Sequence, residues 1–201
     1  MRKLVVLTFV SLDGVMQAPG GKGEDPSGGF DLEGWIVPYF DEAGGKEMEK
    51  QMTPPFDLLL GRKTYEIFAS YWPHQGDDNP IKKVFDQATK YVVSNGAIST
   101  DWPETIQIKG DVVAEVQKLK QQDGPMLQVH GSSNLIQTLL ANDLVDEMWL
   151  KVFPVALGKG KRLFGEGTMP AAFKVTESKM LPSGVIVASY QRDGEVKLGS
   201  F

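Results

Sequence analysis

The sequence predicts an α/β fold with a central, mostly parallel β-sheet that carries helices on both faces. Apolar segments of strand length alternate with helical patterns along most of the chain, and this order is typical of parallel strands joined by crossover helices. The last two strand-like segments follow each other without a helix, so they predict an antiparallel hairpin at one edge of the sheet. The 201 residues contain no internal repeat and no linker, and we expect one domain over residues 1–201.

The individual elements follow from apolar periodicity and from turn residues at their ends. The expected strands cover residues 3–11, 56–60, 90–94, 105–108, 126–129, 147–154, 173–180 and 185–191. The expected helices cover residues 40–52, 64–71, 80–88, 111–121 and 132–141. Gly44 and Gly45 weaken the first helix, whereas Asp111 is a good N-cap for the fourth. The Gly- and Pro-rich stretch from 17 to about 34 is long enough to indicate a lid, a binding loop or a disordered segment.

Composition excludes several classes of function. The chain has 21 basic and 26 acidic residues, a formal charge of -5, which argues against non-specific binding of nucleic acid. It has no Cys, so disulfides, thiolate chemistry and Cys-based zinc sites are excluded, and its two His residues have no metal-ligand spacing. No apolar run approaches the length of a membrane helix, and the first strand is too short an apolar run for a signal peptide. We therefore expect a cytoplasmic protein without a metal site or a membrane partner.

Two strand-to-helix junctions predict a phosphate-binding site. In each, an apolar strand ends in a glycine and runs through small or cationic residues into a helix, whose N-terminal N–H groups and dipole favour an anion. Because both junctions follow the carboxyl ends of expected parallel strands, they should lie at one edge of the sheet. The residues that we expect to bind the ligand there are Gly61, Arg62, Lys63, Thr64, Gly131, Ser132, Ser133 and Asn134.

Arg62 and Lys63 favour a ligand with more than one phosphate. Cations at a helix N-terminus oppose the helix dipole by about 0.3–1 kcal/mol each, so a bound anion explains them better than a solvated surface does. They suit the 2′-phosphate of NADPH, which predicts a preference for NADPH over NADH. Thr64 fits a plain N-cap as well as a phosphate donor, and Ser132 and Ser133 carry the same ambiguity.

These motifs resemble those of the dihydrofolate reductase superfamily. The run from Gly61 to Tyr65 is similar to the cofactor motif of dihydrofolate reductase, and the run from Gly131 to Leu135 is similar to its second pyrophosphate loop. The runs 11–14 and 154–164 resemble the reductase domain of the bifunctional riboflavin-biosynthesis deaminase-reductase most closely. The resemblance covers nearly the whole chain, and the zinc-binding elements of the deaminase half are missing from it.

The resemblance implies a three-layer fold and an NADPH-dependent reductase. Arg62 and Lys63 would then meet the 2′-phosphate, Thr64 the pyrophosphate, and Ser94 the adenosine half of the cofactor. The nicotinamide would lie near Val10 and Ser11, with the substrate beneath the 17–34 loop. The final hairpin and the 147–164 segment resemble the surfaces through which riboflavin-type reductases form homodimers, so a homodimer is expected.

The substrate is less well defined. Dihydrofolate reductase holds its pterin with a helix-borne acid, and an ungapped count back from Gly61 places Gly45 at that position, with Asp41, Glu42 and Glu47 nearby. We therefore expect hydride transfer to a small pterin- or pyrimidinone-like heterocycle rather than to folate itself. The alternatives are a nucleotide-binding or sensor protein without turnover and, with no specific residue in its favour, a flavin-binding protein.

Three side chains are candidates for contact with that substrate. Asp13 precedes a glycine at a strand end, where it fits a turn former as well as a catalytic residue at the mouth of the cleft. Trp35 and Phe40 follow the 17–34 loop and are expected to wall a flat substrate, although Phe40 also fits a role in packing the first helix on the sheet. Hydride transfer needs little side-chain chemistry, because the cofactor carries the reactive atom.

Overall fold

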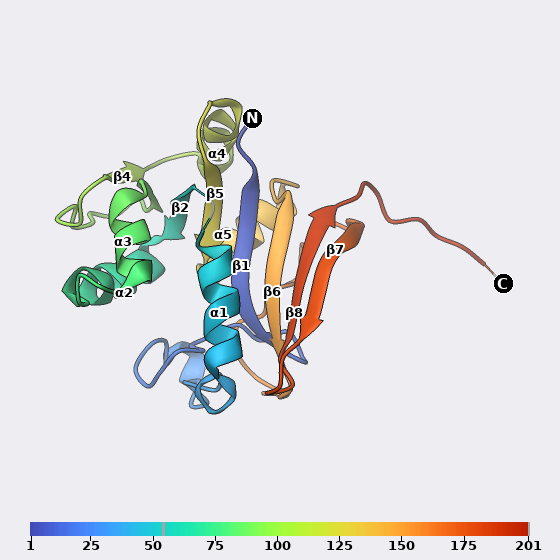
Figure 1. The fold of residues 1–201 in the computed structure, drawn as a ribbon. Coiled ribbons are helices and arrows are strands. Elements are labelled where there is room, and N and C mark those ends of the chain that lie inside the picture. The colour runs from blue at the N-terminus through green and yellow to red at the C-terminus, as the bar shows by residue number, and fades with distance from the viewer. Residues whose placement is uncertain (54, 201) are drawn as a thin grey trace.

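The computed structural model describes residues 1–53 and 55–200, and its centre is one twisted β-sheet (Figure 1). Across the described residues the sheet has eight strands in the order β4-β3-β2-β5-β1-β6-β8-β7. The strands are β1 Leu4–Ser11, β2 Phe56–Gly61, β3 Lys90–Val93, β4 Thr105–Ile108, β5 Met126–His130, β6 Glu147–Phe153, β7 Phe173–Met180 and β8 Ile186–Arg192. The pairs from β4 to β6 are parallel, whereas β8 is antiparallel to both β6 and β7. The predicted fold class is confirmed.

Five α-helices in the described part of the chain form two layers around this sheet. They are α1 Glu42–Gln51, α2 Arg62–Tyr71, α3 Pro80–Gln87, α4 Val112–Gln121 and α5 Ser133–Ala141. Apolar side chains of α4 and α5 pack on one face of the sheet, and those of α2 and α3 pack on the other face together with the end of α1. Figure 1 shows α1 in front of β1, with α5 behind the strands. None of the helices in residues 1–53 and 55–200 is both long and apolar enough to cross a membrane.

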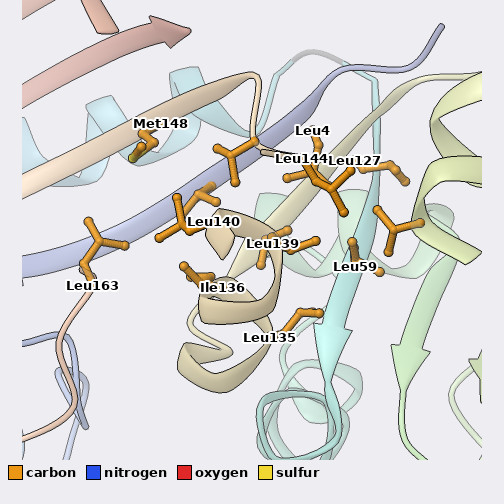
Figure 2. Close-up of a cluster of buried hydrophobic side chains, with 14 of the residues drawn as sticks. Leu4, Leu59, Leu127, Leu135, Ile136, Leu139, Leu140, Leu144, Met148 and Leu163 are labelled. Atoms are coloured by element: carbon orange, nitrogen blue, oxygen red, sulfur yellow. The ribbon is translucent and has the colours of Figure 1, made fainter. Parts of the chain in front are cut away.

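The largest core cluster lies between the sheet and the pair α4 and α5 (Figure 2). Leu4 from β1 and Leu127 from β5 face Ile136 and Leu139 from α5, and all four side chains are fully buried. Burying one such side chain contributes about 1.5–3 kcal/mol, so this layer fixes the positions of β1 and β5. The central strands are apolar on both faces because helices cover both, as parallel sheets require.

The beginnings of two helices differ from the sequence-based expectation. Helix α2 begins at Arg62, with Gly61 as its N-cap, two residues before the expected start at Thr64. Ser132 is the N-cap residue of α5 and has a left-handed backbone conformation with φ of 54°. Its side chain makes no capping hydrogen bond to the helix. The Asp111 cap of α4 is confirmed, because its carboxylate accepts a hydrogen bond from the amide of Ala114 at 3.1 Å.

Candidate functional site

The two strand-to-helix junctions lie side by side and are joined by hydrogen bonds. The amide of Gly61 donates to the hydroxyl of Ser132 at 3.0 Å, and the amide of Ser132 donates to the hydroxyl of Thr64 at 3.0 Å. Both junctions line one cavity of about 480 Å³ at the carboxyl ends of β2 and β5. Parallel sheets bind ligands at this end of their strands. The structure therefore brings together the residues that the sequence pattern associates with phosphate.

The helices that begin at this cavity differ from the others in how they start. Helices α1, α3 and α4 are capped by the side chains of Asp41, Asn79 and Asp111. Among the described residues, α2 and α5 have no capping side chain, so the amides of their first turns keep free N–H donors. Two uncapped N-termini with their positive dipole ends at one cavity form a donor set that suits an anion.

Gly131 allows the two junctions to approach each other. Its φ is +51°, and a Cβ on this residue would lie 3.3 Å from the hydroxyl of Thr64. A larger side chain here would press on Thr64 and occupy the space between the helix ends. The glycine is therefore required by both its backbone conformation and its close neighbour.

Arg62 lies at the corner of the cavity nearest to the end of β3. Ser94 and Gly96 form a turn after β3, in which the hydroxyl of Ser94 donates to the carbonyl of Gly96 at 3.0 Å. Arg62 lies beside this turn, with its Nη1 atom 3.4 Å from the position that a Cβ on Gly96 would take. Its Nε lies 3.5 Å from the carboxylate of Glu66, and both side chains are exposed. Arg62 thus keeps donors available beside the Ser94 turn, where the adenosine half of a dinucleotide was expected. Ser94 lies outside the residues that line the cavity.

Lys63 is paired within the protein instead of being a free cation. The ammonium of Lys63 contacts the carboxylate of Asp25. The ammonium of Lys161 contacts the same carboxylate at 2.6 Å. Burial raises the pKa of Asp25, but the hydrogen bonds from Lys161 and Lys63 outweigh it and bring that pKa well below its usual range. Because Asp25 belongs to the 17–34 loop, this ion-pair cluster ties the loop to α2 and to the 157–163 segment. Lys63 therefore contributes to closing the 17–34 loop, and its expected contact with a 2′-phosphate stays a prediction.

A second cavity, of about 680 Å³, adjoins the first on the α1 side of the sheet. Phe9, Phe68 and His130 line both cavities, so the two form a continuous cleft. The walls of the second cavity are mostly apolar and include Met48, Met52, Trp72 and Phe85. An apolar cavity with a few polar groups is the usual form of a site for a small organic molecule.

The polar groups of the second cavity form a chain beneath the end of α1. The ammonium of Lys151 donates to the side-chain oxygen of Gln51. The side-chain amide of Gln128 donates to the backbone carbonyl of Gln51 at 3.0 Å. The side-chain oxygen of Gln128 lies 3.0 Å from Nε2 of His130. Since that oxygen only accepts, Nε2 of His130 carries the proton. Burial, with the charge of Lys151, lowers the pKa of His130 to about 3, so this ring is neutral at physiological pH.

Glu24 stands where the 17–34 loop covers both cavities. Its carboxylate accepts hydrogen bonds from the amides of Gly20 at 2.6 Å and Gly21 at 3.3 Å. Burial raises the pKa of Glu24 above its ordinary value. This carboxylate therefore holds the loop in shape over the junction of the two cavities.

Asp13, Ser11 and Val10 lie outside the lining of both cavities. Asp13 accepts hydrogen bonds from the hydroxyl of Ser11 at 2.6 Å and from the amides of Leu157 at 3.1 Å and Gly158 at 2.8 Å. The Ser11 hydroxyl first, and then these amides, lower the pKa of Asp13 to about 2. Asp13 thus holds a loop outside the lining of the cleft, and its expected catalytic role stays a prediction. Val10 is buried in the main core, and Ser11 closes the same turn as Asp13, so neither contacts the cleft.

Trp35 and Phe40 also lie away from the cleft. The indole of Trp35 packs edge-on against Phe153 at a centroid distance of 5.4 Å, and its N–H donates to the carbonyl of Gln17. Phe40 is largely exposed and lines neither of the two cavities. Neither residue lines the cleft, and their expected contact with the substrate stays a prediction. Trp35 instead fixes the base of the 17–34 loop against the sheet.

Lys151 and Gln51 are the site residues that sequence reasoning missed. The sequence could have indicated Lys151, which lies in the middle of the apolar strand segment Met148–Phe153. Charged residues are rarely buried inside a strand unless they are paired or have a function. Gln51 offered no comparable signal, since a polar residue near the end of a surface helix is common.

The fold and the cleft together define an α/β protein with a cleft at the carboxyl ends of its parallel strands. The model of the family described as the RibD C-terminal domain matches residues 2–187. This chain belongs to that family, which indicates a reductase-type function.

Comparison with individual proteins agrees with this placement. The chain is 28% identical over 196 residues to the uncharacterized protein YyaP of Bacillus subtilis, with 96% of each chain covered. A pyrimidine reductase-like protein from Corynebacterium diphtheriae superposes with a TM-score of 0.64 at 12% identity, covering 96% of this chain and 93% of the other. Dihydrofolate reductase from Enterococcus faecalis, solved with NADP(H), gives a TM-score of 0.59 at 13% identity, covering 95% and 96%. At these identities the two structures show the shared fold, which is that of dihydrofolate reductase.

Proposed function

We propose that this protein is an NADPH-dependent reductase of a small, flat heterocycle. The observation that supports this function most strongly is the pair of uncapped helix N-termini that meet at one cavity across the Gly61, Thr64 and Ser132 hydrogen bonds. Family membership supports the reductase class. The Enterococcus faecalis enzyme, which shares the fold, was solved with NADP(H).

The groups that line the first cavity fit a dinucleotide. The first-turn amides of α2 and α5 suit the two phosphates of a pyrophosphate, and Gly131 keeps the space between them clear. Arg62, beside Ser94, suits a 2′-phosphate at the adenosine end. A bound nicotinamide supplies the hydride.

The chain's own residues then have separate tasks. The two helix N-termini bind and orient the cofactor, and the 17–34 loop, tied down through Asp25, covers the cleft and limits access of water. The apolar walls of the second cavity hold the substrate beside the shared residues Phe9 and His130. Alignment of the two ligands is the main contribution that hydride transfer requires from the protein.

Cofactor binding tests this function through Arg62. We expect Arg62→Ala to weaken NADPH binding about tenfold, because a charge-assisted hydrogen bond to phosphate is lost, and to leave NADH binding unchanged. Fluorescence titration of both dinucleotides measures this. Lys118→Ala, on the exposed surface of α4, is the charge-matched control and should bind both like the wild type. An unchanged affinity of Arg62→Ala for NADPH would contradict the assignment.

Turnover is tested separately from binding. NADPH oxidation is followed with pterins, pyrimidinone ribityl compounds and quinones as acceptors. We expect oxidation with at least one of these classes. Tight binding of NADPH without oxidation across the whole panel would favour a nucleotide-binding protein without turnover.

A further inference from the structure

We propose that Lys151 determines substrate specificity by donating hydrogen bonds to a carbonyl or deprotonated ring nitrogen of a flat heterocycle in the second cavity. The proposal deepens the proposed function and rests on it for the identity of the cavity as a substrate site. It predicts that oxo-substituted rings bind better than amino-substituted rings of the same shape.

Lys151 is a buried cation whose donors are only partly used. Its side chain lines the second cavity, and the residue is 6% exposed. An ammonium has three N–H donors, and within the described residues the one hydrogen-bond acceptor of Lys151 is the side chain of Gln51. Burying a charge with unused donors is costly, so a ligand that accepts from it gains more here than at the surface.

Gln51 adds donors of the same kind. Its side-chain oxygen accepts from Lys151, so its amide nitrogen is the remaining polar atom, and in the described part of the chain that nitrogen has no acceptor. Gln51 lines the same cavity. The polar patch formed by Lys151 and Gln51 is therefore a donor surface, and a complementary ligand presents acceptors to it.

The neighbouring strands and helix leave the charge of Lys151 without a direct counterion. Its strand neighbours are Phe9 of β1 and Val187 of β8, neither of which titrates, and its ammonium lies 5.5 Å from the centroid of the Phe9 ring. In residues 1–53 and 55–200, no carboxylate lies within ion-pair distance of Lys151. Burial lowers the pKa of Lys151 to about 8, although the charge of Glu47 opposes this.

Besides the exposed side chains of Lys22 and Tyr71, which line the same cavity, three titratable groups share these surroundings within the described residues. Glu47, on α1, pairs with Lys179 at 2.7 Å. His130, on β5, stays neutral above about pH 3. Glu24, on the 17–34 loop, accepts from loop amides. A change in ligand binding near pH 8 is therefore expected to come from Lys151 and not from these neighbours.

Two flat probes with the same ring separate acceptor from donor recognition. 1,3-Dimethyllumazine presents two carbonyl acceptors and has no ionisable N–H group, whereas 2,4-diaminopteridine presents amino donors at the same ring positions. We expect the wild type, without any dinucleotide, to bind 1,3-dimethyllumazine at least tenfold more tightly. Fluorescence titration measures both affinities.

Substitutions at Lys151 assign that preference to one side chain. Lys151→Met keeps the length of the side chain but removes its donors, so we expect at least a tenfold loss in affinity for 1,3-dimethyllumazine and no remaining preference. Lys151→Arg restores donors and should keep the preference. Lys46→Met removes an exposed lysine from α1 and should behave like the wild type. Circular dichroism melting verifies that each variant is folded.

The pH dependence provides a test that does not depend on Lys151→Met. We expect the affinity of the wild type for 1,3-dimethyllumazine to fall as the pH rises through about 8, since the amine is a weaker donor than the ammonium. Lys151→Arg should show no such fall, because the guanidinium stays protonated. A flat pH profile of the wild type from pH 6 to 10 would overturn the proposal, whether or not Lys151→Met folds.

Other results would overturn it equally clearly. These are a folded Lys151→Met variant with wild-type affinity, a wild type that prefers 2,4-diaminopteridine, and a wild type that binds neither probe. None of these measurements uses NADPH. A failure of NADPH binding therefore counts against the proposed function alone, and a failure of the probes counts against Lys151 alone.

Discussion

The hydroxyl of Ser132 joins the two halves of the cleft. It accepts from the amide of Gly61 and donates to the carbonyl of His130 at 2.9 Å. From the sequence, this hydroxyl fitted a plain N-cap as well as a phosphate donor. In the structure it is used inside the protein, so the free donors at this cavity are the amides of the first helical turns.

Asp13 is expected to act on stability and not on ligand binding. Asp13→Asn removes charge-assisted hydrogen bonds to Ser11, Leu157 and Gly158, which should destabilise the protein by about 1–2 kcal/mol. Thermal melting at pH 7 measures this loss, and NADPH titration should show an unchanged affinity. A variant with normal stability and impaired turnover would return Asp13 to a catalytic role.

The same carboxylate predicts a pH dependence. The pKa of Asp13 is about 2 in the folded protein and about 3.9 in an unfolded chain, so its contribution is complete above about pH 4. That contribution is lost as the pH falls through about 2. The difference in melting temperature between wild type and Asp13→Asn should therefore shrink from pH 4 towards pH 2. A difference that stays constant over this range would contradict the lowered pKa.

At the scale of elements, the 17–34 loop is held closed by few strong contacts. Asp25 receives the ammonium groups of Lys63 and Lys161 and is itself largely buried. We expect Asp25→Asn to release the loop, giving faster amide hydrogen exchange over residues 17–34 and faster dissociation of NADPH. Hydrogen exchange and stopped-flow displacement measure the two effects.

Asp31→Asn is the matched control for the loop. Asp31 lies on the same loop and pairs with Lys159 at 2.8 Å, but both side chains are exposed. An exposed ion pair contributes about 0–1 kcal/mol, so this variant should exchange and release NADPH almost like the wild type. Equal effects of the two substitutions would show that Asp25 has no special part in closing the loop.

At the scale of the whole molecule, the homodimer stays a prediction. Strand β7 is an edge strand, and it exposes Val175 and Met180 among polar residues. Free strand edges with apolar side chains favour pairing with another chain. We expect sedimentation velocity to show a dimer that the double substitution Val175→Glu and Met180→Glu converts to a monomer. Leu198→Glu, on the exposed C-terminal segment, should leave the dimer intact. A wild-type monomer would contradict the prediction.

Local patterns were sufficient for most elements of the fold. The sequence predicted the strands β1, β2 and β5 and the Asp111 cap of α4, because each depends on residues close together in the chain. The predicted start of α2 was two residues too late, because the sequence pattern indicates Thr64 as an N-cap. In the folded protein its hydroxyl accepts from Ser132, which lies 68 residues further on.

The sequence by itself determined the alternation of strands and helices and the two junctions that meet at the cleft, since hydrophobic period and turn residues act over a few positions. Only the tertiary structure decided which charges are free. Lys63 is paired with Asp25, 38 residues away, and Lys151 contacts Gln51, 100 residues away. Such contacts depend on how distant segments pack, and electrostatic energy depends on distance and burial in space rather than on separation along the chain.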